Sequence, residues 1–111
     1  MMNDQIYARA LLMAGELDAR QQELLRVQCE ASAAILEARL RDGMTPEDCR
    51  EVFVTAAALQ AVAAMEEVDA VSEFKAGNLT VKSGIRTTER KYQAEALMGP
   101  YLKDRFLFVG V

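Results

Sequence analysis

Residues 52–65 read VFVTAAALQAVAAM, and only Thr55 and Gln60 interrupt this apolar run. A helix that is apolar nearly all round packs against neighbours on several sides. Residues 45–48, TPED, come just before it and supply an N-cap threonine, a first-turn proline and two acids at the positive end of the helix dipole. The sequence therefore predicts a central helix that begins near Pro46 and is covered by the rest of the chain.

Two further helices are predicted before this run. The first covers Asn3 to Ala14, and Gly15 ends it. The second begins after Asp18, whose carboxylate caps the first turn together with Gln21, and it ends at Asp42-Gly43. Its apolar residues recur every three or four positions, which predicts one buried stripe made of Leu24, Val27, Ala31, Ile35 and Ala38.

The spacing of apolar residues changes from a helical to an alternating pattern in residues 73–82, EFKAGNLTVK. Gly77 and Asn78 separate two short alternating runs, which is typical of a β-hairpin with a two-residue turn. Its apolar face either caps the domain's own core or meets a partner, and that face would consist of Phe74, Ala76, Leu79 and Val81.

A fourth helix is expected from Thr88 to Met98, with Tyr92, Ala96 and Leu97 facing inward, and Gly99-Pro100 ends it. The predicted fold class is mainly α: a bundle of about four helices with one small β-hairpin between the third and the fourth. We expect residues 1–105 to form a single domain and residues 106–111, FLFVGV, to form an apolar tail. This tail either folds back on the core or docks on a partner through Phe106, Leu107, Phe108 and Val109.

The bulk composition agrees with one small helical domain of 111 residues. Apolar residues make up 51% of the chain but aromatic residues only 6%, so Ala, Leu and Val dominate and favour close helix packing. The start of the chain has no signal-peptide pattern, and no apolar run approaches the ~18 residues that a membrane span needs. Cys29 and Cys49 match no metal motif or disulfide framework, so we interpret both as reduced, partly buried side chains of a cytoplasmic protein.

No combination of residues suggests catalysis. The chain has no histidine, so the commonest general base and the usual partner of a serine or cysteine nucleophile are both missing. Its six glycines are scattered and form no phosphate-binding loop. We therefore expect a protein that is not an enzyme, with no catalytic, cofactor-binding or metal-binding residues and no cofactor.

Charge is distributed unevenly along the sequence. Residues 44–73 carry a net charge of −6 and residues 74–111 carry +4, within a total of −4. An acidic chain of this kind is unsuited to binding nucleic acid, and we expect no sequence-specific binding to it. The opposite charges pair either within one chain or between copies, and the residues proposed for self-association are Glu66, Glu67, Asp69, Lys75, Lys82, Arg86, Arg90 and Lys91.

The order of these features resembles the head–tail connector proteins (adaptor, or head-completion proteins) of tailed bacteriophages and prophages. The resemblance spans most of residues 17–102. It is carried by the second helix from Leu24 to Leu40, by Thr45-Pro46 with the apolar run, by Ser72 to Lys82, and by the closing residues 94–97 and 100–102. Family members often have a Gly-Asp turn, whereas this chain has Gly77-Asn78.

The resemblance implies a mostly helical structural protein that assembles into a homo-oligomeric ring of about a dozen subunits. Such a ring joins the phage portal protein to a tail-side connector or stopper protein. It implies assembly in the cytoplasm of the bacterial host and a final place at the head–tail junction of the virion, without a membrane partner. The alternative is a small cytoplasmic helical adaptor or regulatory protein that acts as a dimer.

Overall fold

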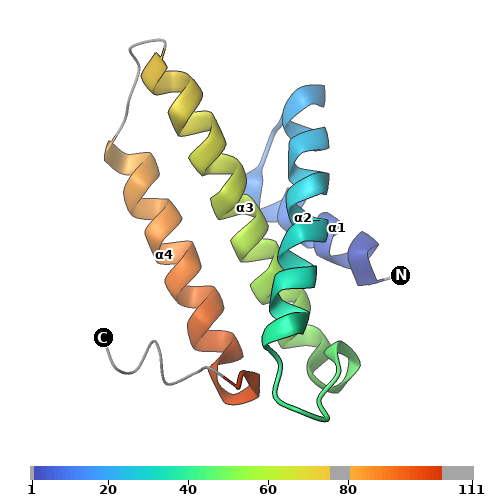
Figure 1. Cartoon of the computed structure of the whole chain (residues 1–111). Helices are drawn as coiled ribbons and strands as arrows, with labels where there is room; N and C mark the ends of the chain where they lie inside the picture. Colours follow the sequence, from blue (N-terminus) through green and yellow to red (C-terminus); the bar gives the residue numbers. More distant parts are fainter. Residues whose placement is uncertain (1, 76–80, 104–111) are drawn as a thin grey trace.

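A computed structural model describes the backbone of residues 2–75 and 81–103 and the side chains of residues 2–68 and 89–103. Within these residues the chain forms four α-helices: α1 (Met2–Ala14), α2 (Ala19–Arg39), α3 (Arg50–Lys75) and α4 (Val81–Met98) (Figure 1). Two short 3-10 helices, η1 (Pro46–Cys49) and η2 (Gly99–Tyr101), precede α3 and follow α4. The prediction of a mainly helical fold is confirmed.

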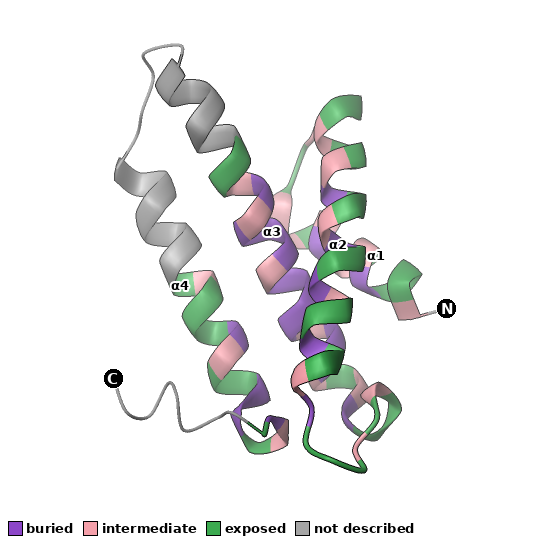
Figure 2. Cartoon of the chain, in the orientation of Figure 1, coloured by how far each residue is buried: buried purple, intermediate pink, exposed green. Residues whose placement is uncertain are grey.

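Helix α3 is the centre of the bundle, and α1, α2 and α4 each pack against it. Buried residues concentrate in the middle of α3 and on the sides of the other helices that face it (Figure 2). Phe53 and Val62 are fully buried there, and so are the small residues Ala56, Ala57, Ala58 and Ala61. Alanines leave room for neighbouring backbones to approach closely, which explains how α3 packs against three other helices. The predicted central helix is therefore confirmed.

The predicted helix starts are also confirmed where local capping chemistry sets them. Asp18 accepts a hydrogen bond from the Gln21 N–H at 2.7 Å, and the Gln21 side chain accepts one from the Asp18 N–H at 3.1 Å. Before α3, the carboxylate of Asp48 accepts a hydrogen bond from the Thr45 N–H at 2.8 Å. Gly15 ends α1 with a φ of 81°, a conformation that glycine adopts easily.

Helix α2 ends at Arg39, earlier than the predicted Asp42-Gly43, because the next residue is extended and pairs with the far end of the chain. Leu40 forms an isolated antiparallel β-bridge with Leu102, and both side chains are buried. The Arg41 N–H donates to the Tyr101 carbonyl at 2.9 Å, and the Lys103 N–H donates to the Arg39 carbonyl at 3.0 Å. This bridge fixes the end of α4 to the end of α2.

The described residues do not form the predicted β-hairpin. Helix α3 continues through Lys75 and α4 begins at Val81, so the described residues at both ends of the predicted hairpin are helical. The turn residues Gly77 and Asn78 lie outside the described residues. An isolated two-stranded hairpin is at best marginally stable, whereas these residues extend two long helices that pack against each other.

Two predicted helix faces are wrong. On α2 the buried residues are Leu25, Cys29, Ser32 and Leu36, while Val27 is 52% exposed and Ile35 is 57% exposed. A helical repeat of about 3.6 residues fits this set as well as the predicted one, so periodicity alone cannot choose between the two. Among the described side chains of α4, residues 89–98, the buried ones are Ala94 and Met98. The residues predicted to face inward, Tyr92, Ala96 and Leu97, are exposed instead.

Candidate functional site

Most of the residues that were predicted to form the buried stripe of α2 lie instead on an exposed apolar surface, and only Leu24 packs partly against the core. We call this surface the outer α2 sector, and it consists of Leu24, Val27, Gln28, Ala31, Ala34, Ile35 and Ala38. No charged residue belongs to it, and Leu24 and Gln28 are only partly exposed. Large aliphatic side chains such as Val27 and Ile35 gain free energy when a partner removes them from water. The outer α2 sector is therefore the candidate functional site.

Part of this sector forms one wall of a groove. Helix α3 supplies its floor, with Gln60 and Ala64, and α4 supplies the opposite wall, with Lys91 and Glu95. The groove has a volume of about 260 Å³ and is partly open to solvent. Ala31 and Ile35 line its α2 side. Its lining combines apolar side chains with two glutamine amides and the charged Glu67, Lys91 and Glu95, which suits a peptide or a helix with polar groups better than an apolar small molecule.

The charged residues at the rim of this groove already have partners within the chain. The Arg39 guanidinium donates two hydrogen bonds to the Glu95 carboxylate, at 2.6 and 2.8 Å, and both side chains are about three-quarters buried. Lys91 of α4 pairs with Glu67 of α3. These pairs hold α4 against α2 and α3, and they leave the groove without an unpaired charge among the side chains described around it.

The residues predicted for self-association can now be placed in part. Glu66 pairs with Arg90 and Glu67 pairs with Lys91, so four of them meet between α3 and α4 of one chain. The side chains of the other four, Asp69, Lys75, Lys82 and Arg86, lie outside the described residues. Self-association through these charges stays a prediction. Glu66 and Glu67 already have partners within the same chain.

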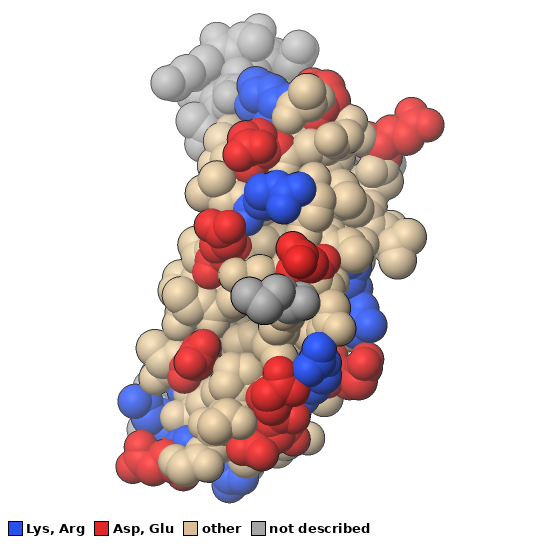
Figure 3. Space-filling view, turned by 90° about the vertical axis from the view of Figure 1, so that its right-hand side faces the viewer, with Lys and Arg blue, Asp and Glu red and all other residues tan. Residues whose placement is uncertain are grey.

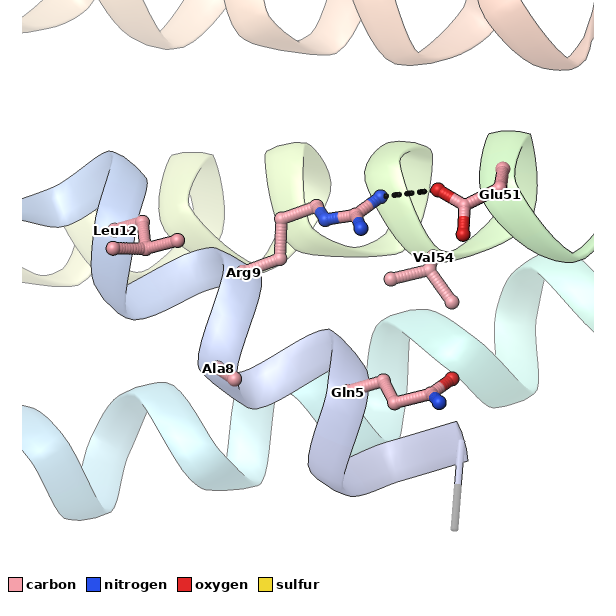
Figure 4. Close-up of a pocket in the computed structure, with 6 residues that line it drawn as sticks. All are labelled: Gln5, Ala8, Arg9, Leu12, Glu51 and Val54. Atoms are coloured by element: carbon pink, nitrogen blue, oxygen red, sulfur yellow. Dashed lines mark hydrogen bonds and ion pairs between the residues drawn. The ribbon is translucent and has the colours of Figure 1, made fainter.

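Two other hollows lie along α3. Figure 4 shows the one between α1 and α3, where Arg9 reaches Glu51 at 3.2 Å above Val54, and the volume is about 270 Å³. The same arginine donates to the Thr55 hydroxyl at 2.7 Å. A shallower depression of about 450 Å³ lies between α3 and α4 and is lined by Thr55, Leu59, Gln93, Ala96 and Leu97. Neither hollow contains a nucleophile beside a base.

The two cysteines are buried and form no disulfide, so their predicted burial is confirmed. Burial raises the pKa of the Cys29 thiol from 9.0 to about 11, and this effect outweighs the lowering by the Arg26 guanidinium, which Glu30 opposes. Burial also raises the pKa of Cys49, and the nearby Asp48 carboxylate adds to this effect. A thiol with a raised pKa is a poor nucleophile, so neither cysteine is suited to covalent catalysis.

Acidic and basic side chains are interspersed on the side of the molecule seen in Figure 3, and neither sign forms a continuous field there. Among the residues that the structure describes, no group of three or more Cys, Asp or Glu side chains is arranged to hold a metal ion. Within the same residues, no helix combines the length and apolar character of a membrane span.

No known protein family, curated protein or solved structure matches this chain. The predicted docking residues Phe106, Leu107, Phe108 and Val109 and the turn residues Gly77 and Asn78 lie outside the described residues.

The outer α2 sector was missed as a surface because its residues were assigned to the core. The signal that could have revealed it is that α2 carries two apolar sectors side by side, and a helix packed on one side buries only one of them.

Proposed function

We propose that this chain is a structural protein that works by binding other proteins, and that it is a ring-forming head–tail connector subunit of a tailed phage or prophage. In that role it joins the portal protein to a tail-side connector or stopper protein. It is assembled in the bacterial cytoplasm and remains at the head–tail junction of the virion. It carries out no reaction and needs no cofactor.

The observation that carries the proposal is the exposed, uncharged outer α2 sector. Exposed apolar side chains that share one face of a helix offer a surface to which another protein can bind. Val27 and Ile35 stand two helical turns apart on that surface, and each is about half exposed. Because the charged groups at the groove rim are paired within the chain, apolar burial is the main source of affinity that this face offers a partner.

The order of the helices supports the connector as the particular kind of binding protein. In the resemblance, a helix pair is followed by a proline-initiated central helix and a closing helix, and α1 to α4 follow this order. Pro46 lies in η1 directly before α3, and Pro100 lies in η2 directly after α4. The hairpin that also contributes to the resemblance is not part of this support.

The test is to purify the full chain, alone and mixed with the portal protein encoded in the same genome. Negative-stain electron microscopy and native mass spectrometry then give the shape and the subunit number of each assembly. We expect closed rings, alone or seated on the portal. A chain that neither forms rings nor binds the portal contradicts the proposal, and a discrete dimer that ignores the portal supports the adaptor alternative instead.

A further inference from the structure

The groove between α2, α3 and α4 contains a polar side chain that the fold itself does not use. Ser32 lines the groove from α2 and is only 5% exposed, so it is almost completely removed from solvent. The described residues offer no hydrogen bond to its hydroxyl. Because no fully buried polar side-chain atom in this part of the chain lacks a partner, the hydroxyl has to be accessible from the groove. A nearly buried hydroxyl without a partner costs free energy, so its presence calls for an explanation.

Two glutamine side chains bring further hydrogen-bonding groups to the same place. Gln28 lies on α2 one turn before Ser32, and Gln60 lies on α3 at the floor of the groove. Neither amide has a hydrogen-bond partner among the residues that the structure describes. Each glutamine offers a carbonyl acceptor and two N–H donors, and the serine hydroxyl can both donate and accept. The groove therefore presents donors and acceptors side by side on two helices.

The charged side chains on the wall formed by α4 restrict the charge of a ligand. Lys91 is paired with Glu67, and Glu95 is paired with Arg39. A charged ligand would find no unpaired counter-charge among the described side chains of the groove, and removing its charge from water would cost free energy. The groove is therefore suited to a neutral ligand.

The remaining lining residues and the volume restrict the size and the apolar part of a ligand. Ala31, Ile35 and Ala64 offer apolar contact beside the three polar side chains. The volume of about 260 Å³ equals that of roughly nine water molecules at ~30 Å³ each. This is room for about a dozen non-hydrogen atoms, the size of one amino-acid residue with a blocked amino and carboxyl group.

We propose that this groove binds a neutral ligand that carries an amide group. The N–H and C=O groups of the amide form hydrogen bonds with Gln28, Ser32 and Gln60, and the apolar part of the ligand covers Ile35. Two sources supply this chemistry, a free small molecule and the backbone of an extended peptide, because both present the same donor and acceptor. The inference goes beyond ring formation and does not depend on it, so its failure would leave the proposed function untouched.

The test uses N-acetyl-leucinamide, which is neutral, has two amide groups and fits the volume of the groove. A two-dimensional NMR titration of the full wild-type chain should show saturable shifts at residues 28–35 and 60–67, with the millimolar Kd expected of so small a ligand. The methyl ester of N-acetyl-leucine lacks the terminal N–H donors and should bind about fivefold more weakly. A blocked tripeptide of leucine and alanine distinguishes the sources: binding about tenfold tighter than N-acetyl-leucinamide identifies peptide backbone, and equal or weaker binding identifies a free small molecule.

Ser32→Ala separates a role in ligand binding from a role in the fold. Because the hydroxyl has no partner in the free chain, its loss should leave the Tm unchanged or raise it, and should weaken binding of N-acetyl-leucinamide about fivefold. Gln60→Ala should weaken binding to a similar extent. Gln93→Ala is the matched control and should leave binding unchanged, because Gln93 lines the hollow between α3 and α4 and not this groove.

Three results would overturn the inference. The first is a wild-type chain that does not bind N-acetyl-leucinamide at millimolar concentrations. The second is an ester that binds as tightly as the amide, which would mean that apolar contact alone holds the probe. The third is a Ser32→Ala variant that loses thermal stability and keeps its affinity for the probe, which would assign the hydroxyl to the fold.

Discussion

Helix α2 carries two apolar sectors whose compositions are similar and whose environments differ. The inner sector, Leu25, Cys29, Ser32 and Leu36, is almost completely removed from solvent against α3. The outer sector, which differs from it by about one residue in register, leaves Val27 and Ile35 half exposed. The difference shows that apolar periodicity identifies a helix with something to bury, but not which of its faces the chain itself buries. The inner sector stabilises the fold, and the outer sector remains for a partner.

The largest expected effect is a difference in the free energy of unfolding between mutations at neighbouring positions on these two sectors. Leu36→Ala removes a fully buried side chain and should lower the free energy of unfolding by about 2–5 kcal/mol, because it leaves a cavity against α3. Ile35→Ala, one residue away, should change it by less than about 1 kcal/mol, because its side chain is more than half exposed. Urea denaturation of the two variants measures the contrast. Equal costs would mean that the two sectors have been assigned to the wrong faces.

A smaller effect is expected where the outer sector meets α4. Glu95→Gln removes the charge that neutralises Arg39 in a mostly buried pair, and should cost about 1–3 kcal/mol of stability. Glu51→Gln is the matched control, because Glu51 is 82% exposed in its pair with Arg9, and this change should cost less than about 1 kcal/mol. Chemical denaturation of both variants decides whether the Arg39–Glu95 pair holds the groove together. Similar costs for the two would show that it does not.

Loss of the N-cap of α2 should by itself lower the stability of the chain. Asp18→Ala removes the acceptor for the Gln21 N–H and should lower stability by about 1 kcal/mol. Asp18→Asn keeps a side-chain oxygen at that position and should recover most of the loss. Thermal unfolding followed by circular dichroism measures both. An alanine variant as stable as the wild type would show that tertiary packing, and not the cap, fixes this end of both sectors.

A final expected effect, confined to alkaline pH, concerns the thiol in the inner sector. Because burial raises the pKa of Cys29 to about 11 in the folded chain, its contribution to stability is fully present below its ordinary pKa of 9.0. That contribution is lost as the pH rises from 9.0 to about 11, since the unfolded chain gives up the proton first. Urea midpoints of the wild type and of Cys29→Ala, measured across this range, isolate the effect. A pH dependence that is identical in the two would contradict it.

The features that the sequence predicts well are those with local causes. Asp18 and Gln21 cap α2 within one turn, and the apolar run around Phe53 makes a helix central whatever surrounds it. The choice between Leu24 and Leu25 as the inward residue depends on how α2 rotates against α3, which no local pattern encodes. The hairpin prediction failed in its described residues for the same reason, because the packing of α3 against α4 favours helix up to Lys75 and again from Val81.

The candidate site was harder to predict than the fold. A surface for a partner and a buried stripe have the same apolar composition, so Val27 and Ile35 look like core residues in the sequence. The pairing of Glu66 with Arg90 could be anticipated only as one of two alternatives, because charge complementarity does not distinguish contacts within a chain from contacts between chains.

The most direct test of the account is whether assembly depends on the outer α2 sector and not on exposed apolar residues in general. Sedimentation velocity should be run on the wild-type chain, Ile35→Asp and Leu12→Asp at matched concentrations, alone and with portal protein. We predict that the wild type and Leu12→Asp form the same assembly, whereas Ile35→Asp stays monomeric with unchanged helix content. If Ile35→Asp assembles as the wild type does, the outer α2 sector is not the binding surface.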